Sequence, residues 1–227
     1  TTLQAETRLD HSWSAWIKLD DGVRSNANVV MATKDGTGDD SKSVFSVLTS
    51  GKLRYNLEVE AADKIADEAS ASFADGTNPW KHIVATVSDS NNQIELYVDG
   101  VKRTLDGTND GDMSGVTHSN YANVNEIYMG AYNVNGTAEN FMLGGLRDVR
   151  FYDYTLSDEQ VKSLFLGRYL PTPLHWWKMI EGTGATATIE DYGTGTDSDG
   201  TGVSLTWAGT DNYKINGSAR IGTNGSI

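Results

Sequence analysis

The sequence predicts an all-β fold with one short helix, and two observations carry this prediction. Short segments in which apolar and polar residues alternate recur along the chain, and this period of two is typical of half-buried strands. Tight-turn dipeptides separate these segments, because Asp-Gly or Asn-Gly occurs ten times in 227 residues. The chain has 24 glycines and only three prolines, so we expect glycine turns between short antiparallel strands.

The amino-acid composition argues against several classes of binding partner and binding site. The formal net charge is −13, with 31 acidic and 18 basic residues, which argues against a nucleic-acid partner. No apolar run is long enough to insert into a membrane. The absence of cysteine excludes disulfides and thiolate metal sites. The acidic balance is compatible with solubility and with acidic loops that hold a cation.

Strands are expected at regular intervals in the first part of the chain. Trp13–Leu19 alternates, with Trp13 and Trp16 on opposite faces. The further expected strands are 28–33, 44–49, 52–59, 80–87, 94–98, 101–105 and 125–131. Residues 60–78 are rich in alanine, which favours helix by propensity but buries little, so we expect a weak edge strand and a loop there. Residues 106–123 are expected to form a long polar loop.

The segment 141–157 combines a strand with the start of a helix. Leu146–Tyr152 alternates between apolar and polar residues. Ser157–Gln160 has the form of a capping box, and Leu156 and Val161 occupy the positions of a hydrophobic staple. Gly167 is the expected end of this helix.

The last part of the chain returns to β structure. Residues 169–173 have the composition of a linker, and the expected strands that follow are 174–180, 203–207, 213–215 and 218–221. So few strands cannot close a core of their own. They are expected to pack onto the first part of the chain or onto a neighbour.

Three blocks of sequence carry a resemblance to a known family. They are Trp80-Lys-His-Ile-Val-Ala85 with Leu96-Tyr-Val-Asp-Gly100, then Ile127-Tyr-Met-Gly130, and Phe141 to Ser157. These blocks are similar to the central strands and the signature segment of concanavalin A-like, laminin G-like domains. The resemblance covers roughly residues 12–167. It implies a lectin-like jelly-roll β-sandwich of two antiparallel sheets with one short helix.

The order of one motif departs from that family. A Trp-x-Phe-x-Glu-Gly-x-Gly…Asp motif opens the family's domains, but here it appears near the C-terminal end, as Trp177-Lys-Met-Ile-Glu-Gly-Thr-Gly184…Asp191. One explanation is a single circularly permuted domain over residues 1–227, in which 1–167 form the main body and 174–227 supply the displaced first strands. The other is that residue 174 begins a second unit that another chain completes. The short linker favours permutation, because the first and last strands of a jelly roll normally lie side by side.

The sequence predicts no enzyme. Related sandwiches that cleave glucans carry a Glu-x-Asp-x-x-Glu strand, whose carboxylates perform double displacement, and that spacing is absent here. Nucleophile-elbow, phosphate-loop and zinc-protease motifs are absent too. The histidines are scattered at positions 11, 82, 118 and 175, and His82 falls at a packing position of the family.

Two interpretations of the acidic loops stay open: a structural calcium site, or aspartates that cap the backbone of their own turns. Calcium prefers six to eight oxygen ligands, which acidic glycine-rich loops supply. The resemblance implies a site where the first and last strands meet, and a separate loop offers a second set of carboxylates. The candidate ligands are Asp148, Asp191, Asp197 and Asp199 for the first site and Asp35, Asp39 and Asp40 for the second.

Loop aromatics are the candidate ligand-binding residues, because sugars are held by an aromatic face together with polar groups. The candidates are Tyr121, Tyr132, Trp176 and Tyr192. Trp176 is offset from the strand face that carries Trp177.

Three functions remain open on this sequence. The first is a non-catalytic recognition or adhesion module outside the cell or on a cell or virion surface, with a glycan or other cell-surface ligand. The second is a structural or decoration component of a virus or phage particle or of a cell-surface layer, in contact with copies of itself or with other surface proteins. The third is a non-catalytic domain of a polysaccharide-degrading enzyme.

Overall fold

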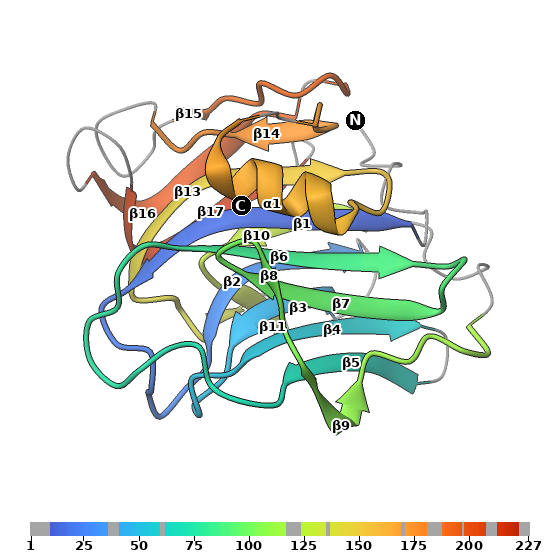
Figure 1. The fold of residues 1–227 in the computed structure, drawn as a ribbon. Helices are drawn as coiled ribbons and strands as arrows, with labels where there is room; N and C mark the ends of the chain where they lie inside the picture. Colours follow the sequence, from blue (N-terminus) through green and yellow to red (C-terminus); the bar gives the residue numbers. More distant parts are fainter. Residues whose placement is uncertain are drawn as a thin grey trace.

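The structure is a computed structural model that describes residues 10–35, 41–59, 62–116, 124–134, 137–168, 171–180, 188–196, 198–207 and 213–222. Its strands form two facing layers, and a single helix lies on the outside of one of them (Figure 1). The elements are β1 (His11–Leu19), β2 (Asn28–Asp35), β3 (Ser41–Val47), β4 (Leu53–Val59), β5 (Ala62–Glu68), β6 (Lys81–Ser88), β7 (Gln93–Val98), β8 (Val101–Lys102), β9 (Leu105–Asp110), β10 (Val124–Met129), β11 (Tyr132–Val134), β12 (Thr137–Glu139), β13 (Gly144–Tyr152), α1 (Asp158–Leu166), β14 (His175–Trp177), β15 (Thr188–Ile189), β16 (Gly200–Trp207) and β17 (Tyr213–Gly222).

The strands pair antiparallel along one continuous path. The order is β8-β7-β6-β1-β13-β17-β10-β2-β3-β4-β5-β9, and β14 pairs with β13 beside this path. The path folds over on itself, so that β6, β7 and β13 form one layer while β2, β3 and β4 form the other (Figure 1). In the middle of the path, neighbours such as β1 and β13 or β17 and β10 are far apart in sequence, as expected for the predicted jelly-roll β-sandwich.

Alternation along β1 shows how the sequence builds both faces of a layer. Trp13, Ala15, Ile17 and Leu19 are at most 1% exposed and point into the core between the layers. Trp16 lies on the opposite, outer face and is half-buried. Because the side-chain period of a strand is two, β1 places one tryptophan on each face, as predicted.

The helix begins and ends as predicted. The side chain of Ser157 accepts a hydrogen bond from the backbone N–H of Gln160, and the Gln160 side chain reaches back to Ser157 N–H. Leu156 and Val161 are both buried in the cluster that holds α1 on its layer. Gly167 ends the helix with a φ of 61°, a left-handed conformation that glycine adopts easily.

The C-terminal segment pairs with strands of the same chain. Val149 of β13 lies opposite Trp177 of β14, and Gly144–Leu146 of β13 lies opposite residues 215–213 of β17. On its other edge β17 pairs with β10. The segment 174–222 thus contributes strands beside β13 and between β13 and β10. Circular permutation itself stays a prediction.

Three local predictions require comment. Residues 62–68 form the predicted strand, β5, but it is not at the edge of the sheet, because it lies between β4 and β9. The predicted polar loop is wrong at 106–110, because β9 pairs its backbone with β5 although its side chains are mostly exposed or half-buried. The predicted turn at Asn216-Gly217 is also wrong, because it lies inside β17, which continues from 213 to 222 and is irregularly paired with β16 near that point.

Candidate functional site

Trp176 is held on the outer face of β14 by two carboxylates. Its neighbours His175 and Trp177 point into the core, so the alternation of β14 turns Trp176 outward, where it is half-buried. The backbone N–H of Trp176 donates to Asp191 Oδ1 over 2.9 Å, and its indole Nε1–H donates to Asp148 Oδ1 over 3.0 Å. The ring is therefore fixed both at its backbone and at its edge.

A tyrosine and two cations surround this indole. The Tyr192 and Trp176 rings lie 6.2 Å apart with an angle of 61° between their planes, which makes an aromatic corner. Lys178 Nζ lies 3.6 Å from the centre of the Tyr192 ring and 4.7 Å from that of Trp176. The Arg150 guanidinium carbon lies 4.7 Å from the Trp176 ring. We call these five residues (Asp148, Arg150, Trp176, Lys178 and Tyr192) the Trp176 cluster.

Strand pairing positions this cluster. Arg150 of β13 lies directly opposite Trp176 of β14, and Asp148 N–H donates to the backbone carbonyl of Lys178 over 3.2 Å. Asp148 has a φ of 51°, an uncommon left-handed conformation for a residue with a side chain, which locally interrupts the alternation of β13. Arg150 Nη2 lies 3.3 Å from Asp148 Oδ1, so this carboxylate is shared between a guanidinium and the indole.

Asp191 is the anchor beneath the cluster. Burial by itself would raise the pKa of this carboxyl, but hydrogen bonds from His175 and from the N–H groups of Trp176 and Gly193 outweigh it and lower the pKa below its usual range. The His175 Nδ1 and Asp191 Oδ2 atoms lie 2.5 Å apart, and both side chains are at most 4% exposed. Asp191 therefore stays ionised and fixes the loop that carries Tyr192 against β14.

The predicted calcium ligands are only partly brought together. Asp148 and Asp191 bind the two ends of Trp176, and Asp199 Oδ1 accepts from the Asp191 backbone N–H. In the described ranges, no three acidic or histidine side chains form a group that could hold a metal ion. Asp39, Asp40 and Asp197 lie outside the described residues, and only the backbone of Asp35 is described. The calcium site stays a prediction.

The predicted ligand-binding aromatics also separate into groups. Trp176 and Tyr192 meet in the cluster. Tyr132 lies on β11, which pairs with β12 in a separate two-stranded sheet, and Tyr121 lies outside the described residues. Sequence reasoning missed Arg150 and Lys178. The signal in the sequence was the alternation of side chains along β13 and along β14. This alternation, continued one residue past β14 to Lys178, places Arg150 and Lys178 on the outer face with Trp176.

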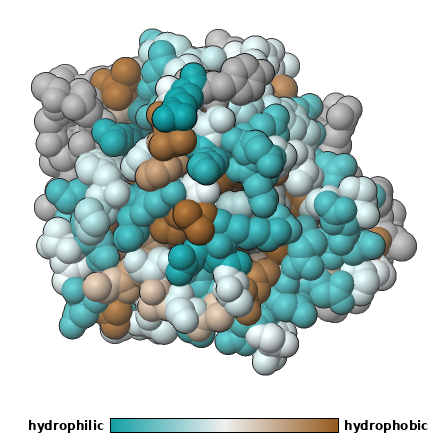
Figure 2. Space-filling view, in the orientation of Figure 1, coloured by the Kyte–Doolittle hydropathy of each residue, from teal (hydrophilic) through white to brown (hydrophobic). Residues whose placement is uncertain are grey.

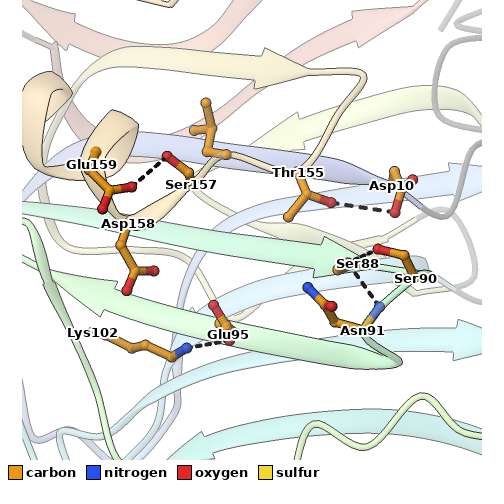
Figure 3. A pocket seen from close by; sticks show the side chains of 11 residues that line it. Asp10, Ser88, Ser90, Asn91, Glu95, Lys102, Thr155, Ser157, Asp158 and Glu159 are labelled. Carbon is orange, nitrogen blue, oxygen red and sulfur yellow. Dashed lines mark hydrogen bonds and ion pairs between the residues drawn. The ribbon is translucent and has the colours of Figure 1, made fainter.

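A polar cavity of about 590 Å³ lies at the other end of this layer, between the start of α1 and strands β7 and β8 (Figure 3). Carboxylates of Asp10, Glu95, Asp158 and Glu159 line it together with hydroxyl groups and Lys102. Beneath it, the Tyr97 hydroxyl lies 2.6 Å from carboxylate oxygens of both Glu95 and Asp158. Burial and these two carboxylates raise the pKa of Tyr97, so its phenol stays protonated.

This cavity is a poorer site for a sugar ring than the Trp176 cluster. The described side chains that line it include no aromatic ring, so it lacks a flat apolar surface. The whole face around α1 is mostly hydrophilic, with hydrophobic side chains in small separate patches (Figure 2). The Trp176 cluster combines ring faces with charged groups, which the cavity does not.

The histidines form structural hydrogen bonds where they are described. Nε2 of His11 lies 2.8 Å from the Tyr55 hydroxyl, and Nε2 of His82 lies 2.9 Å from the Ser14 hydroxyl. Burial and, to a smaller extent, the nearby charge of Arg150 lower the pKa of His82 to about 3, so His82 is neutral. His118 lies outside the described residues. The packing role predicted for His82 fits its position within the sheet.

No helix in the described part of the chain has the length and apolar character needed to cross a membrane.

Comparisons with solved structures show the same architecture. The CBM40 module of a Ruminococcus gnavus IT-sialidase, bound to α2,6-sialyllactose, superposes with a TM-score of 0.56 at 14% identity, over 70% of this chain and 85% of the module. A heptameric SAP-like pentraxin from Limulus polyphemus superposes with a TM-score of 0.50 at 14% identity, over 98% of this chain and 88% of the pentraxin. At these identities the likeness shows the fold.

Sequence comparisons show the family. The C-reactive protein of Rattus norvegicus is 29% identical over 97 residues, which span 42% of this chain and 40% of that protein. A model of the concanavalin A-like lectin/glucanases superfamily matches residues 2–162, more than half of the chain. The fold and the family implied by the sequence blocks are confirmed. The chain belongs to the concanavalin A-like lectin/glucanases superfamily.

Proposed function

We propose that this protein is a non-catalytic carbohydrate-binding module whose ligand lies on the Trp176 cluster. The observation that carries the proposal is the aromatic corner of Trp176 and Tyr192, fixed by Asp148 and Asp191 and flanked by Lys178. A sugar ring has an apolar face of C–H groups and a rim of hydroxyl groups. The two rings can pack against the face, while charged side chains bind the rim.

Preorganisation supports this proposal. Ordering a mobile side chain on binding costs free energy, and a ring that is already held avoids that cost. Trp176 is held by two hydrogen bonds to buried or half-buried carboxylates. Tyr192 is 38% exposed, so part of its ring is accessible to a ligand. Its contact with Lys178 restricts the movement of the ring. The aromatic rings of the Trp176 cluster are therefore held in place before a ligand binds.

The family and the structural neighbours agree with this function. The superfamily includes lectins by its description, and the Ruminococcus gnavus module binds sialyllactose. The proposal that the module is non-catalytic is supported by the cluster itself. Asp148 of the cluster and Asp191 beneath it each accept hydrogen bonds from N–H groups that hold Trp176 and its loop, which is a structural role for both carboxylates. A location outside the cell or on a surface is part of the same proposal.

A glycan array followed by one matched pair of variants tests this function. Wild-type protein is expected to bind at least one glycan on the array, and Tyr192→Ala is expected to weaken that binding by about 1–2 kcal/mol, or roughly five- to thirtyfold. Phe141→Ala is the control, because Phe141 is exposed by the same 38% but lies outside the cluster. Equal losses in both variants, or no glycan binding by folded wild-type protein, would contradict the proposal.

A further inference from the structure

A second group of aromatic and cationic side chains lies on the outer face of the same layer. Trp16 of β1 is directly opposite Arg147 of β13 on one side and His82 of β6 on the other. Trp80 precedes β6 and shares the face of His82, two residues further on. The Arg147 guanidinium carbon lies 4.5 Å from the Trp80 ring centre and 5.4 Å from that of Trp16. The Arg147 side chain thus extends across β1 and contacts both rings.

Among the described residues, the guanidinium of Arg147 has no carboxylate partner. Three other arginines are paired with carboxylates: Arg54 with Asp67, Arg103 with Glu68 and Arg150 with Asp148. In the described ranges, by contrast, Arg147 makes no hydrogen bond, and its Nε is buried without a partner. The two terminal nitrogens of Arg147 are not fully buried, so their N–H donors are accessible to solvent.

This lack of a partner stands out against the composition of the chain. The chain carries 31 acidic and 18 basic residues, so a cation without a carboxylate partner contrasts with its acidic balance. Lys18 lies on the same face of β1 as Trp16, and in the described part of the chain no carboxylate pairs with it either. Two cations beside two half-buried tryptophans form a local positive site on an acidic protein.

We propose that Trp16, Trp80 and Arg147 form a second binding site, which takes the carboxylate of an acidic sugar. The planar guanidinium can donate two parallel hydrogen bonds to a carboxylate, and its contacts with both indole rings hold it beside them. Trp80 is half-buried and contacts Arg147 through its ring, so the rest of its accessible surface can pack against the sugar ring. A uronic acid offers both groups: a carboxylate and an apolar ring face.

Isothermal titration of the full chain with oligogalacturonate tests this site. The methyl-esterified oligomer is the matched ligand, because it keeps the sugar rings and removes the charge. We expect binding of the acid form, at least tenfold weaker binding of the ester, and at least a tenfold loss for Arg147→Gln. Arg168→Gln, which removes an exposed guanidinium after α1, is expected to bind as the wild type does.

Two further variants separate this site from the Trp176 cluster and from a folding defect. Arg147→Lys keeps a cation near the rings but cannot form bidentate hydrogen bonds to a carboxylate. Its affinity for oligogalacturonate is expected to fall several-fold, while its melting temperature stays near that of the wild type. Trp176→Ala is expected to keep oligogalacturonate binding. Wild-type affinity in folded Arg147→Gln or Arg147→Lys, equal binding of acid and ester, or no binding of the acid form would overturn the second site. None of these outcomes bears on neutral glycans at the Trp176 cluster.

Discussion

Replacing Trp177 with alanine is expected to lower the free energy of unfolding by about 3–5 kcal/mol, the usual cost of removing a large buried aromatic side chain. Trp177 is fully buried, stacks on His175 with ring centres 5.5 Å apart, and donates its indole N–H to the Ser198 carbonyl over 3.0 Å. Its backbone lies opposite Val149 of β13. Its removal opens a cavity where the C-terminal segment meets the main body.

Urea denaturation followed by circular dichroism measures this loss, and Trp176→Ala is the matched control. The two tryptophans are adjacent, but Trp176 is half-buried on the outer face, so its replacement is expected to cost much less, about 1 kcal/mol. A loss below about 1 kcal/mol for Trp177→Ala would mean that the segment 174–222 does not pack into the core of its own chain.

Trp176→Ala is expected to have the opposite profile: a folded protein that has lost glycan binding. Tryptophans at the centre of a binding surface commonly contribute about 2 kcal/mol or more, so affinity should fall by roughly thirtyfold or more. The variant removes the ring that Lys178 and Arg150 contact and leaves Asp148 without its indole donor.

Calorimetric titration with a glycan selected on the array gives this affinity. Trp176→Phe supplies an intermediate, because it keeps an aromatic face but cannot donate to Asp148. We expect its affinity to fall between those of the wild type and Trp176→Ala. Undiminished binding by Trp176→Ala would place the ligand elsewhere on the molecule.

Local sequence signals predicted the parts of the fold that local interactions determine. The helix 158–166 was predictable because its cap, its staple and its terminal glycine are all contained in a short stretch. The same holds for β1, where strict alternation assigns Trp13 to the core and Trp16 to the outer face. For both elements, the sequence alone predicts which face is buried.

The features that were missed depend on partners distant in sequence. β9 is polar and mostly exposed, and only its backbone pairing with β5 makes it a strand. Asn216-Gly217 has the composition of a turn, yet pairing with neighbouring strands keeps the backbone of β17 extended through it. The contact of Arg147 with Trp80 crosses an intervening strand, so no spacing along the chain could have shown it.

The candidate site was half predictable for the same reason. Trp176 and Tyr192 were singled out as aromatics in polar surroundings, but their meeting depends on Asp191, which anchors one to the other through the loop. Arg150 joins them only because β13 pairs with β14.

The indole N–H signal of Trp176 in a proton–nitrogen correlation spectrum tests the central claim most directly. The chain has six tryptophans, and Trp176→Phe identifies the signal by its loss. During titration with a glycan that binds, we predict that the Trp176 signal shifts, because its N–H lies at the edge of the bound sugar and donates to Asp148, while the buried Trp13 and Trp177 signals stay in place. A Trp176 signal that remains unchanged when the protein is saturated with glycan would contradict the account.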